Sequence, residues 1–356
     1  EICACLVGSE MCIRDSSNLV LNSLGSASFI EAATAGDDAI ALVDPDGTIR
    51  YYQVTVNQSI HGSTDKTALS VVGTDAYAII QNSVFSENHK NTALTLNGGV
   101  ANLSNGIIDN SIFYNNQENA DGTIKGGAVY LTDGVVNDTK FIKNVLSTTS
   151  GLGGALYVEN SAKIIDSAFS ANSAASGGAI YAAGTNLSVY GSTFVDNSAN
   201  NGGAIFIESG TANIYDSIFS YNQADNGAAI YKSGGTLNIY GSTFENNTAG
   251  NGIIFNYDGN LNIKNSTFAN NAANNSFGAI KQNSGVANIE NTLFSNNTSA
   301  LSSAVDITSG NVYINNSVFE ENTSHEKAAV GINAGVNAII KNSIFKNNTS
   351  TECYGT

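Results

Sequence analysis

Short stretches of alternating hydrophobic and polar residues run along most of the chain, and one of them recurs every 24 to 28 residues. Around Ile214, for example, Asn213 and Tyr215 flank the β-branched residue, and Phe219 follows five positions later. Alternation with a period of two is typical of β-strands that bury one face, whereas a helix would show apolar spacing near 3.6 residues. The pattern predicts an all-β protein built from short strands.

The recurring stretch carries a Phe-x-x-Asn motif, with Ser or Thr two residues before the phenylalanine and Ile or Val five residues before it. A second strand is predicted at a Gly-Gly-Ala-Ile motif, as at Gly177–Ile180 and Gly202–Ile205. The first motif occurs at Phe85/Asn88, Phe113/Asn116, Phe141/Asn144, Phe169/Asn172, Phe194/Asn197, Phe219/Asn222, Phe244/Asn247, Phe268/Asn271, Phe294/Asn297, Phe319/Asn322 and Phe345/Asn348.

A unit of about 25 residues with two or three short strands cannot bury its apolar face alone, so the units must stack on one another. We therefore predict a right-handed single-stranded parallel β-helix with coils of roughly 25 residues and a rise of about 4.8 Å per coil. Stacking turns each repeated position into a ladder, with phenylalanines in the core and asparagine amides bonded at a corner. The structural ladder is expected at Phe169, Phe194, Phe219, Phe244, Phe268, Asn172, Asn197, Asn222, Asn247 and Asn271.

Four segments are expected along the chain. Residues 1–16 read as a translated sequencing adapter, an artefact that contains the only methionine and three of the four cysteines. Residues 17–73 are less regular, and we expect irregular N-terminal coils or a cap there. Residues 74–350 are predicted to form the β-helix repeats and residues 351–356 a truncated end, so the chain is expected to be an interior piece of a longer protein.

The paired motifs resemble a known family. Gly-Gly-Ala-Ile and Phe-x-x-Asn, recurring in order, are the hallmark of the chlamydial polymorphic outer-membrane-protein repeat, and similar repeats occur in adhesin-like surface proteins. The resemblance covers Thr74 to Ser350, although Ser303–Val305 and Ala328–Val330 replace the glycine motif in the last coils. It implies a β-helical passenger with an adhesive role.

The chain is acidic, with a net charge of −16 at pH 7, and its basic residues form no patch. Scattered negative charge repels phosphate backbones, which argues against nucleic acid as a partner. Cysteine is too rare for a disulfide framework or a zinc cluster, and no apolar run could span a bilayer. We therefore predict no cofactor, no metal and no membrane span. We expect an extracellular or cell-surface location, which for a Gram-negative bacterium means the outer membrane.

Parallel β-helices also include polysaccharide lyases and glycosidases, which need a carboxylate pair about 5–9 Å apart or calcium with a basic residue. The best candidates, Asp138, Asp166 and Asp216, lie three residues before the phenylalanine of their units. Other units carry Asn265 or Gly191 there, so the position favours residues that tolerate turns or left-handed backbone. We predict that these aspartates are structural and that the chain has no catalytic residues.

Aromatic residues suggest a binding surface. In the strand at the glycine motif, Ile180 and Ile205 share a mostly apolar parity, but Lys232 falls in the same class, and we expect Lys232 to be exposed. The other parity should face outward and form an exposed stripe, which can bind sugar rings or a partner protein, or merely stack on itself. The first stripe is Tyr130, Tyr157, Tyr181, Phe206 and Tyr231, and a second, on the adjoining strand, is Tyr190, Tyr215 and Tyr240.

Two functions of different class are compatible with these features. The preferred one is a non-catalytic, adhesin-like β-helical rod that mediates attachment or surface display, with an unknown host-cell, glycan or surface-protein ligand. The alternative is a β-helical carbohydrate-active enzyme, either a polysaccharide lyase or a glycoside hydrolase. The first is preferred because the candidate carboxylates coincide with turn positions.

Overall fold

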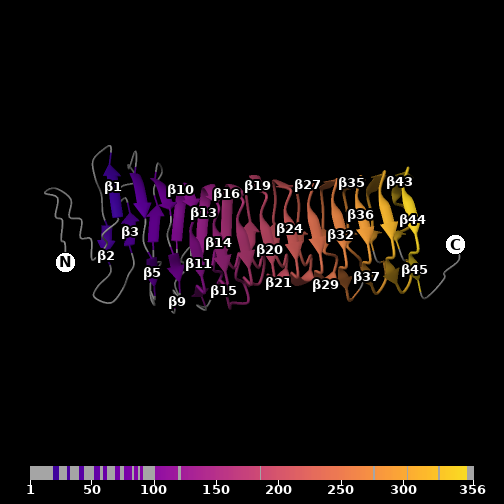
Figure 1. Ribbon diagram of the computed structural model, residues 1–356, viewed down its shortest axis with the longest axis horizontal. Helices are drawn as coiled ribbons and strands as arrows, with labels where there is room; N and C mark the ends of the chain where they lie inside the picture. The colour runs from indigo at the N-terminus through magenta and orange to yellow at the C-terminus, as the bar shows by residue number, and fades with distance from the viewer. Residues whose placement is uncertain are drawn as a thin grey trace.

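Short strands stack in parallel along one axis in the computed structural model, and the stack forms a rod (Figure 1). The structure describes residues 101–350 apart from 119–121, 185, 276, 303 and 328, together with the backbone of strands β1–β9 before them. Side chains are described at Ile80 and Phe85 and from residue 106 onward, except for residue 118 and the gaps just named. The segments 1–16 and 351–356 lie outside the described residues, and the expected segment boundaries stay predictions.

Three faces of the rod are made by four sheets. The largest sheet has 23 strands and holds both the glycine-motif strand and the strand that precedes each Phe-x-x-Asn motif. Its strands are β1 Leu19–Ser23, β2 Ile30–Ala32, β3 Ile40–Val43, β4 Tyr52–Val56, β6 Leu69–Val72, β7 Ala76–Gln81, β10 Ala101–Asp109, β13 Val129–Asn137, β16 Leu156–Ile165, β18 Ile180–Ala182, β19 Asn186–Tyr190, β22 Ile205–Ile207, β23 Thr211–Tyr215, β26 Ile230–Lys232, β27 Thr236–Tyr240, β30 Ile254–Asn256, β31 Asn260–Lys264, β34 Ile280–Gln282, β35 Val286–Glu290, β38 Val305–Ile307, β39 Asn311–Asn315, β42 Val330–Ile332 and β43 Asn337–Lys341.

The second face is a 12-stranded sheet that carries the phenylalanines. Its strands are β5 Ser59–His61, β8 Val84–Ser86, β11 Ile112–Tyr114, β14 Lys140–Ile142, β17 Ala168–Ser170, β20 Thr193–Val195, β24 Ile218–Ser220, β28 Thr243–Glu245, β32 Thr267–Ala269, β36 Leu293–Ser295, β40 Val318–Glu320 and β44 Ile344–Lys346.

The third face is divided into a sheet of three strands and a sheet of seven. The three are β9 His89–Lys90, β12 Gln117–Glu118 and β15 Val145–Leu146, and the seven are β21 Ser198–Asn201, β25 Gln223–Asn226, β29 Thr248–Asn251, β33 Ala272–Ala273, β37 Thr298–Ser299, β41 Thr323–Ser324 and β45 Thr349–Ser350.

The phenylalanine ladder lies in the core, as predicted. Successive rings stack with centroids 4.6 to 5.0 Å apart, from Phe85 to Phe345, and Phe85 through Phe319 are fully buried. The β-branched residue five positions earlier is buried too, so that β23 alternates between buried Ala212 and Ile214 and half-buried neighbours. Each inner ring packs between two identical rings, so stacking of the repeats forms the core. The prediction of a parallel β-helix is confirmed.

The asparagine ladder holds the corner after each phenylalanine. In one coil the Asn222 amide donates to the Phe194 carbonyl at 2.9 Å and to Asn247 Oδ1 at 3.0 Å, while its backbone N–H donates to the same oxygen at 2.9 Å. Asn222 therefore connects three successive coils. The same three bonds recur in the described coils at Asn116, Asn144, Asn172, Asn197, Asn247, Asn271, Asn297 and Asn322.

Serine or threonine two residues before each phenylalanine forms a parallel ladder. Ser217 Oγ donates to the Tyr215 carbonyl at 2.8 Å and accepts the backbone N–H of Ser192 at 3.2 Å. The backbone conformation of the turn explains why glycine occurs in the second motif. Gly177 has φ of +64°, and a Cβ there would lie 2.2 Å from the Ile180 carbonyl oxygen, so a side chain would require the turn to shift.

Strand pairing differs near the N-terminus. The backbones of β1 and β4 pair in antiparallel fashion, as do those of β2 and β3, whereas the pairings from β5 onward are parallel along the described strands. β3 and β4 then continue into parallel pairs with β6 and β7.

Candidate functional site

The first aromatic stripe lies on the outer face of the large sheet, but three of its residues are not exposed. Tyr130, Tyr157 and Tyr181 retain only 5, 4 and 7% of their accessible surface, so the prediction of an exposed stripe is wrong for them. The segments around the glycine motifs cover them: Leu152 packs on this cluster and Lys125 Nζ lies 4.7 Å from the Tyr157 centroid. Phe206 and Tyr231 are half-buried.

Ring stacking decides what the first stripe can bind. Successive rings from Tyr130 through Tyr231, and on to Phe255, have centroids 4.7 to 5.4 Å apart and interplanar angles of at most 14°. Each inner ring therefore presents its two faces to neighbouring rings and only its edge to the outside. A sugar ring binds by stacking on an aromatic face. The faces of these inner rings are already covered by neighbouring rings and are not accessible to a sugar. Sequence reasoning missed Phe255, although it follows Ile254 as Tyr231 follows Ile230.

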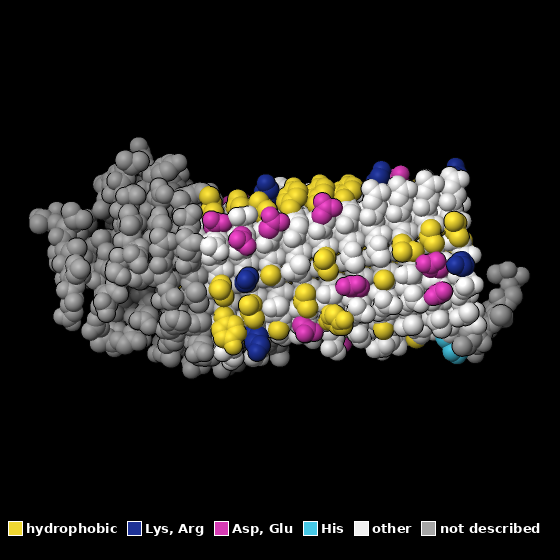
Figure 2. All heavy atoms as spheres, in the orientation of Figure 1, with side chains coloured by type: hydrophobic (Ala, Val, Ile, Leu, Met, Phe, Trp, Pro, Cys, Tyr) yellow, Lys and Arg dark blue, Asp and Glu magenta, His cyan; other side chains and the backbone are white. Residues whose placement is uncertain are grey.

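Burial also changes the chemistry of these phenols. The hydroxyl of Tyr181 donates to Glu208 at 3.0 Å, and burial raises the pKa of Tyr130, Tyr157 and Tyr181 above the ordinary tyrosine value. They are neutral hydrogen-bond donors at neutral pH. Figure 2 shows hydrophobic side chains in a row along one edge of the described rod, with acidic side chains beside them.

The second stripe is half-buried and equally self-stacked. Tyr190 and Tyr215 have centroids 4.9 Å apart, and Tyr215 and Tyr240 are 5.2 Å apart. Lys163 covers the free end of this stack, with Nζ 5.3 Å from the Tyr190 centroid. In the following coils the position holds Lys264 and Glu290, which form an ion pair at 3.2 Å. The stripe therefore presents ring edges rather than a platform.

The three candidate carboxylates occupy left-handed corners. Asp138, Asp166 and Asp216 have φ of +41°, +45° and +48°, and Gly191 and Asn265 adopt the same conformation in their coils. Backbone conformation explains the choice of residue there, which supports the structural interpretation. Among the described residues, no group of three or more His, Cys, Asp or Glu side chains could hold a metal ion.

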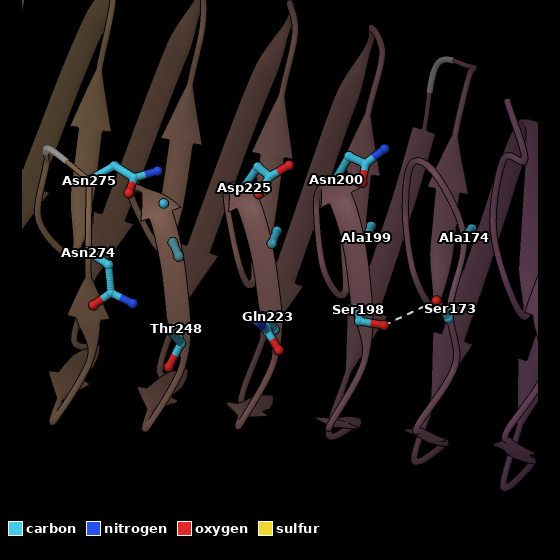
Figure 3. Close-up of a pocket in the computed structure, with 13 residues that line it drawn as sticks. Ser173, Ala174, Ser198, Ala199, Asn200, Gln223, Asp225, Thr248, Asn274 and Asn275 are labelled. Carbon is cyan, nitrogen blue, oxygen red and sulfur yellow. Dashed lines mark hydrogen bonds between the residues drawn. The ribbon is translucent and has the colours of Figure 1, made fainter. Parts of the chain in front are cut away.

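A polar groove on the third face was missed by sequence reasoning. It encloses about 420 Å³ and crosses five coils, over β21, β25, β29 and the segments beside them. Figure 3 shows Ser198, Gln223 and Thr248 along one side and Asn200 and Asp225 along the other, with small side chains between them. Its complete lining is Ser173, Ala174, Ser198, Ala199, Asn200, Gln223, Ala224, Asp225, Thr248, Ala249, Gly250, Asn274 and Asn275.

Small residues create this groove. Ala199, Ala224 and Ala249 are paired in register on successive strands. Upstream, the same ladder holds Leu146, which is buried against Ile124 and Ala174. Replacing leucine by alanine removes three carbons per coil from the floor, and the surface is hollowed there. The signal in the sequence is the change from Leu to Ala at one position of the repeat.

Ser198 Oγ donates to Ser173 Oγ at 3.1 Å at one end of the groove, but the longer polar side chains of the groove differ from those beside it. At the edge of the groove strands, Asn226 Nδ2 donates to Asn201 Oδ1 and Asn251 Nδ2 donates to Asn226 Oδ1, both at 2.9 Å. Gln223 and Asp225, in contrast, are exposed and form no side-chain hydrogen bond with the described residues. Their residue types change from coil to coil, so a ladder cannot form.

Lysine also enters the interior. Lys232 is fully buried, so the prediction that it is exposed is wrong. Its parity places it inside the rod, where Nζ donates to Asn256 Oδ1 at 2.6 Å and to the Asp258 carbonyl, and Asn256 donates to Gln282 at 2.6 Å. Burial lowers the pKa of Lys232 to about 8. This polar run replaces the Ile207 and Ile307 of flanking coils.

A second buried lysine is paired with a carboxylate. Lys281 Nζ lies 2.5 Å from Asp306 Oδ1 and 3.2 Å from the centroid of the Phe277 ring, and both charged side chains are almost fully buried. Burial lowers the pKa of Lys281. The pair continues the row of the first aromatic stripe, since Phe255 is in register with Lys281.

Comparison with known proteins agrees with this architecture. Residues 122–268 match the family model described as a right handed beta helix region. No curated protein and no solved structure matches the chain. The chain is therefore a right-handed parallel β-helix repeat protein. Within the part of the chain that the structure describes, no helix is long and apolar enough to cross a membrane.

Proposed function

We propose that this chain is a non-catalytic, adhesin-like rod that acts outside the cell or at its surface and attaches to a glycan or protein ligand through the groove of the third face. The observation that carries the proposal is the lining of that groove, which contains a single carboxylate, Asp225. Glycoside hydrolysis by the usual mechanism needs two carboxylates across one bond. A groove with amides, hydroxyls and one carboxylate is suited to holding a ligand.

The repeat itself supports the narrower assignment to the polymorphic outer-membrane-protein type. Its two motifs have separate structural roles: Phe219 and Asn222 fill the core and bond the corner, while Gly202 takes a left-handed turn before Ile205. A rod with such internal bonding carries a binding surface away from its point of attachment. For a Gram-negative bacterium that point would be the outer membrane.

The test combines a binding assay and an activity assay on the whole chain. Fluorescently labelled protein should bind cultured cells saturably, and the double variant Asn200→Ala, Gln223→Ala should bind less. The variant Gln117→Ala is the control, because Gln117 has the same strand position upstream of the groove. Release of oligosaccharides from pectin or alginate, lost in Asp225→Asn, would replace this proposal with the carbohydrate-active enzyme.

A further inference from the structure

The direction of the groove determines the shape of its ligand. Its lining begins at Ser173 and ends at Asn275, and it crosses five coils that rise about 4.8 Å each, so it follows the rod axis for about 19 Å. A compact molecule would use only part of this length. An extended chain lying parallel to the axis would contact every coil.

The hydrogen-bonding groups determine its chemistry. Gln223 offers both a donor and an acceptor, Thr248 a hydroxyl and Asn200 an amide, and none of these side chains is bonded to another described residue. Between the two polar rows lie small side chains, of which Ala199 is partly exposed and Ala224 is almost fully buried. A ligand that matches this lining is rich in hydroxyl groups.

The charge of the groove further restricts the class of ligand. Asp225 is the one charged residue in the lining, and the whole chain has a net charge of −16. An acidic polysaccharide would meet repulsion without a compensating Lys or Arg in the groove. An extended peptide binds best by adding a strand to a free sheet edge, but the groove lies on strands that are already paired on both sides, such as β25 between β21 and β29.

We propose that the groove binds a linear, uncharged glycan whose chain runs along the rod axis, an inference that rests on the proposed attachment function and names its ligand class. Polar side chains of successive coils contact successive sugar units, which lie over the small residues between the two polar rows. The aromatic stripes take no part, because their ring faces are occupied by one another.

The test uses defined glycans and the full chain. Cellohexaose, mannohexaose, xylohexaose and chitohexaose are the neutral probes, and hexagalacturonate is the acidic one, each titrated by isothermal calorimetry. At least one neutral hexamer should bind, with an affinity that salt leaves nearly unchanged. The acidic hexamer should bind at least tenfold more weakly at low salt.

Variants tie that binding to the groove. The double variant Asn200→Ala, Gln223→Ala should lower the affinity roughly tenfold or more, since it removes two hydrogen bonds of modest strength. Ala224→Leu should lower it too, because a larger side chain between the two polar rows reduces the hollow. Gln117→Ala and Tyr215→Ser should leave the affinity unchanged, and circular dichroism confirms folding of each variant.

The outcomes separate this inference from the proposed function. Cell binding that persists while no neutral hexamer binds overturns the ligand class and leaves the attachment role standing. Tighter binding of hexagalacturonate than of the neutral probes, or loss of binding in Tyr215→Ser alone, also overturns it. Cleavage of a neutral hexamer overturns the attachment role but keeps the ligand class.

Discussion

Asn222 and Gln223 are neighbours in the chain, but Asn222 lies at a corner where its side chain is buried and hydrogen-bonded, and Gln223 lies in the groove, where its side chain is exposed. Asn222 is fully buried and bonds both to Phe194 and to Asn247, and the same residue recurs in every described coil at that corner. Gln223 is exposed and unbonded to described residues, and its position holds Ser198 and Thr248 in adjacent coils. Where the residue type repeats, its polar groups are used for stability. At the groove position the residue type varies, and the side chains of Gln223 and Thr248 have no hydrogen bond to another described residue.

The largest loss of stability is expected for a substitution in the phenylalanine core. Phe219→Ala should lower the free energy of unfolding by about 3–5 kcal/mol, because it opens a cavity between two stacked rings. Gln223→Ala, a few residues away, should change it by less than about 0.5 kcal/mol. Urea denaturation followed by circular dichroism measures both. Equal losses at the two positions would contradict the division between corner and groove.

Asn222→Ala is the closest contrast with Gln223→Ala. Its loss removes the oxygen that accepts the backbone N–H and the side-chain amide of Asn197, and the amide that donates to the Phe194 carbonyl. We expect it to cost about 1–3 kcal/mol, measured by the same denaturation. An unchanged midpoint would show that water replaces the amide at this corner, and the ladder would then carry little stability.

The ladders of repeated residues could be predicted from the sequence, but the groove was missed. Phe219, Asn222 and Ser217 recur at fixed spacing, and stacking identical coils determines their contacts, so periodicity alone was enough. The groove arises from a difference between coils, Leu146 against Ala199, which a search for similarity passes over.

Two other errors have separate causes. The burial of Tyr157 depends on Lys125 and Leu152, which belong to turns that alternation within a strand does not describe. Parity did place Lys232 inside, but the usual preference of lysine for solvent led to the opposite expectation. Its burial is possible because Asn256 and the Asp258 carbonyl accept its protons.

Lys232 gives a pH-dependent test of an interior position where the repeat is interrupted. Its pKa in the folded chain is about 8, below the ordinary value of 10.5, so the unfolded chain binds the proton more tightly. Below pH 8 the lysine is charged in both states and its burial penalty is fully present. Stability should therefore rise between about pH 8 and 9.5.

Thermal denaturation across that range measures the rise. Lys232→Met should reduce the slope and raise the melting temperature at pH 7, and the remaining slope would come from Lys281, whose pKa is also lowered. Lys264→Met, at an exposed ion pair, is the control. A melting temperature of the wild type that falls between pH 8 and 9.5 would contradict the assignment.

The smallest effects are expected at two serines. Ser217 Oγ donates to the Tyr215 carbonyl and accepts the Ser192 N–H, whereas Ser324 Oγ is buried without a hydrogen-bond partner in the described structure. Ser217→Ala should therefore cost about 1 kcal/mol, and Ser324→Ala should be neutral or stabilising by up to about 1 kcal/mol. Denaturation midpoints that shift in the same direction by the same amount would show that the pairing of Ser217 is not what stabilises its ladder.

The corner bonds have a further consequence for how genes of this kind change. Asn197, Asn222 and Asn247 are spaced by 25 residues and make the same bonds to their neighbours. Unequal crossover between two such units would insert or delete one whole coil and restore every corner bond at the junction. The non-repeating groove residues would be duplicated or lost in the same event, whereas crossover between units outside the groove would leave them intact. Recombination outside the groove can thus change the length of the rod without changing the groove residues.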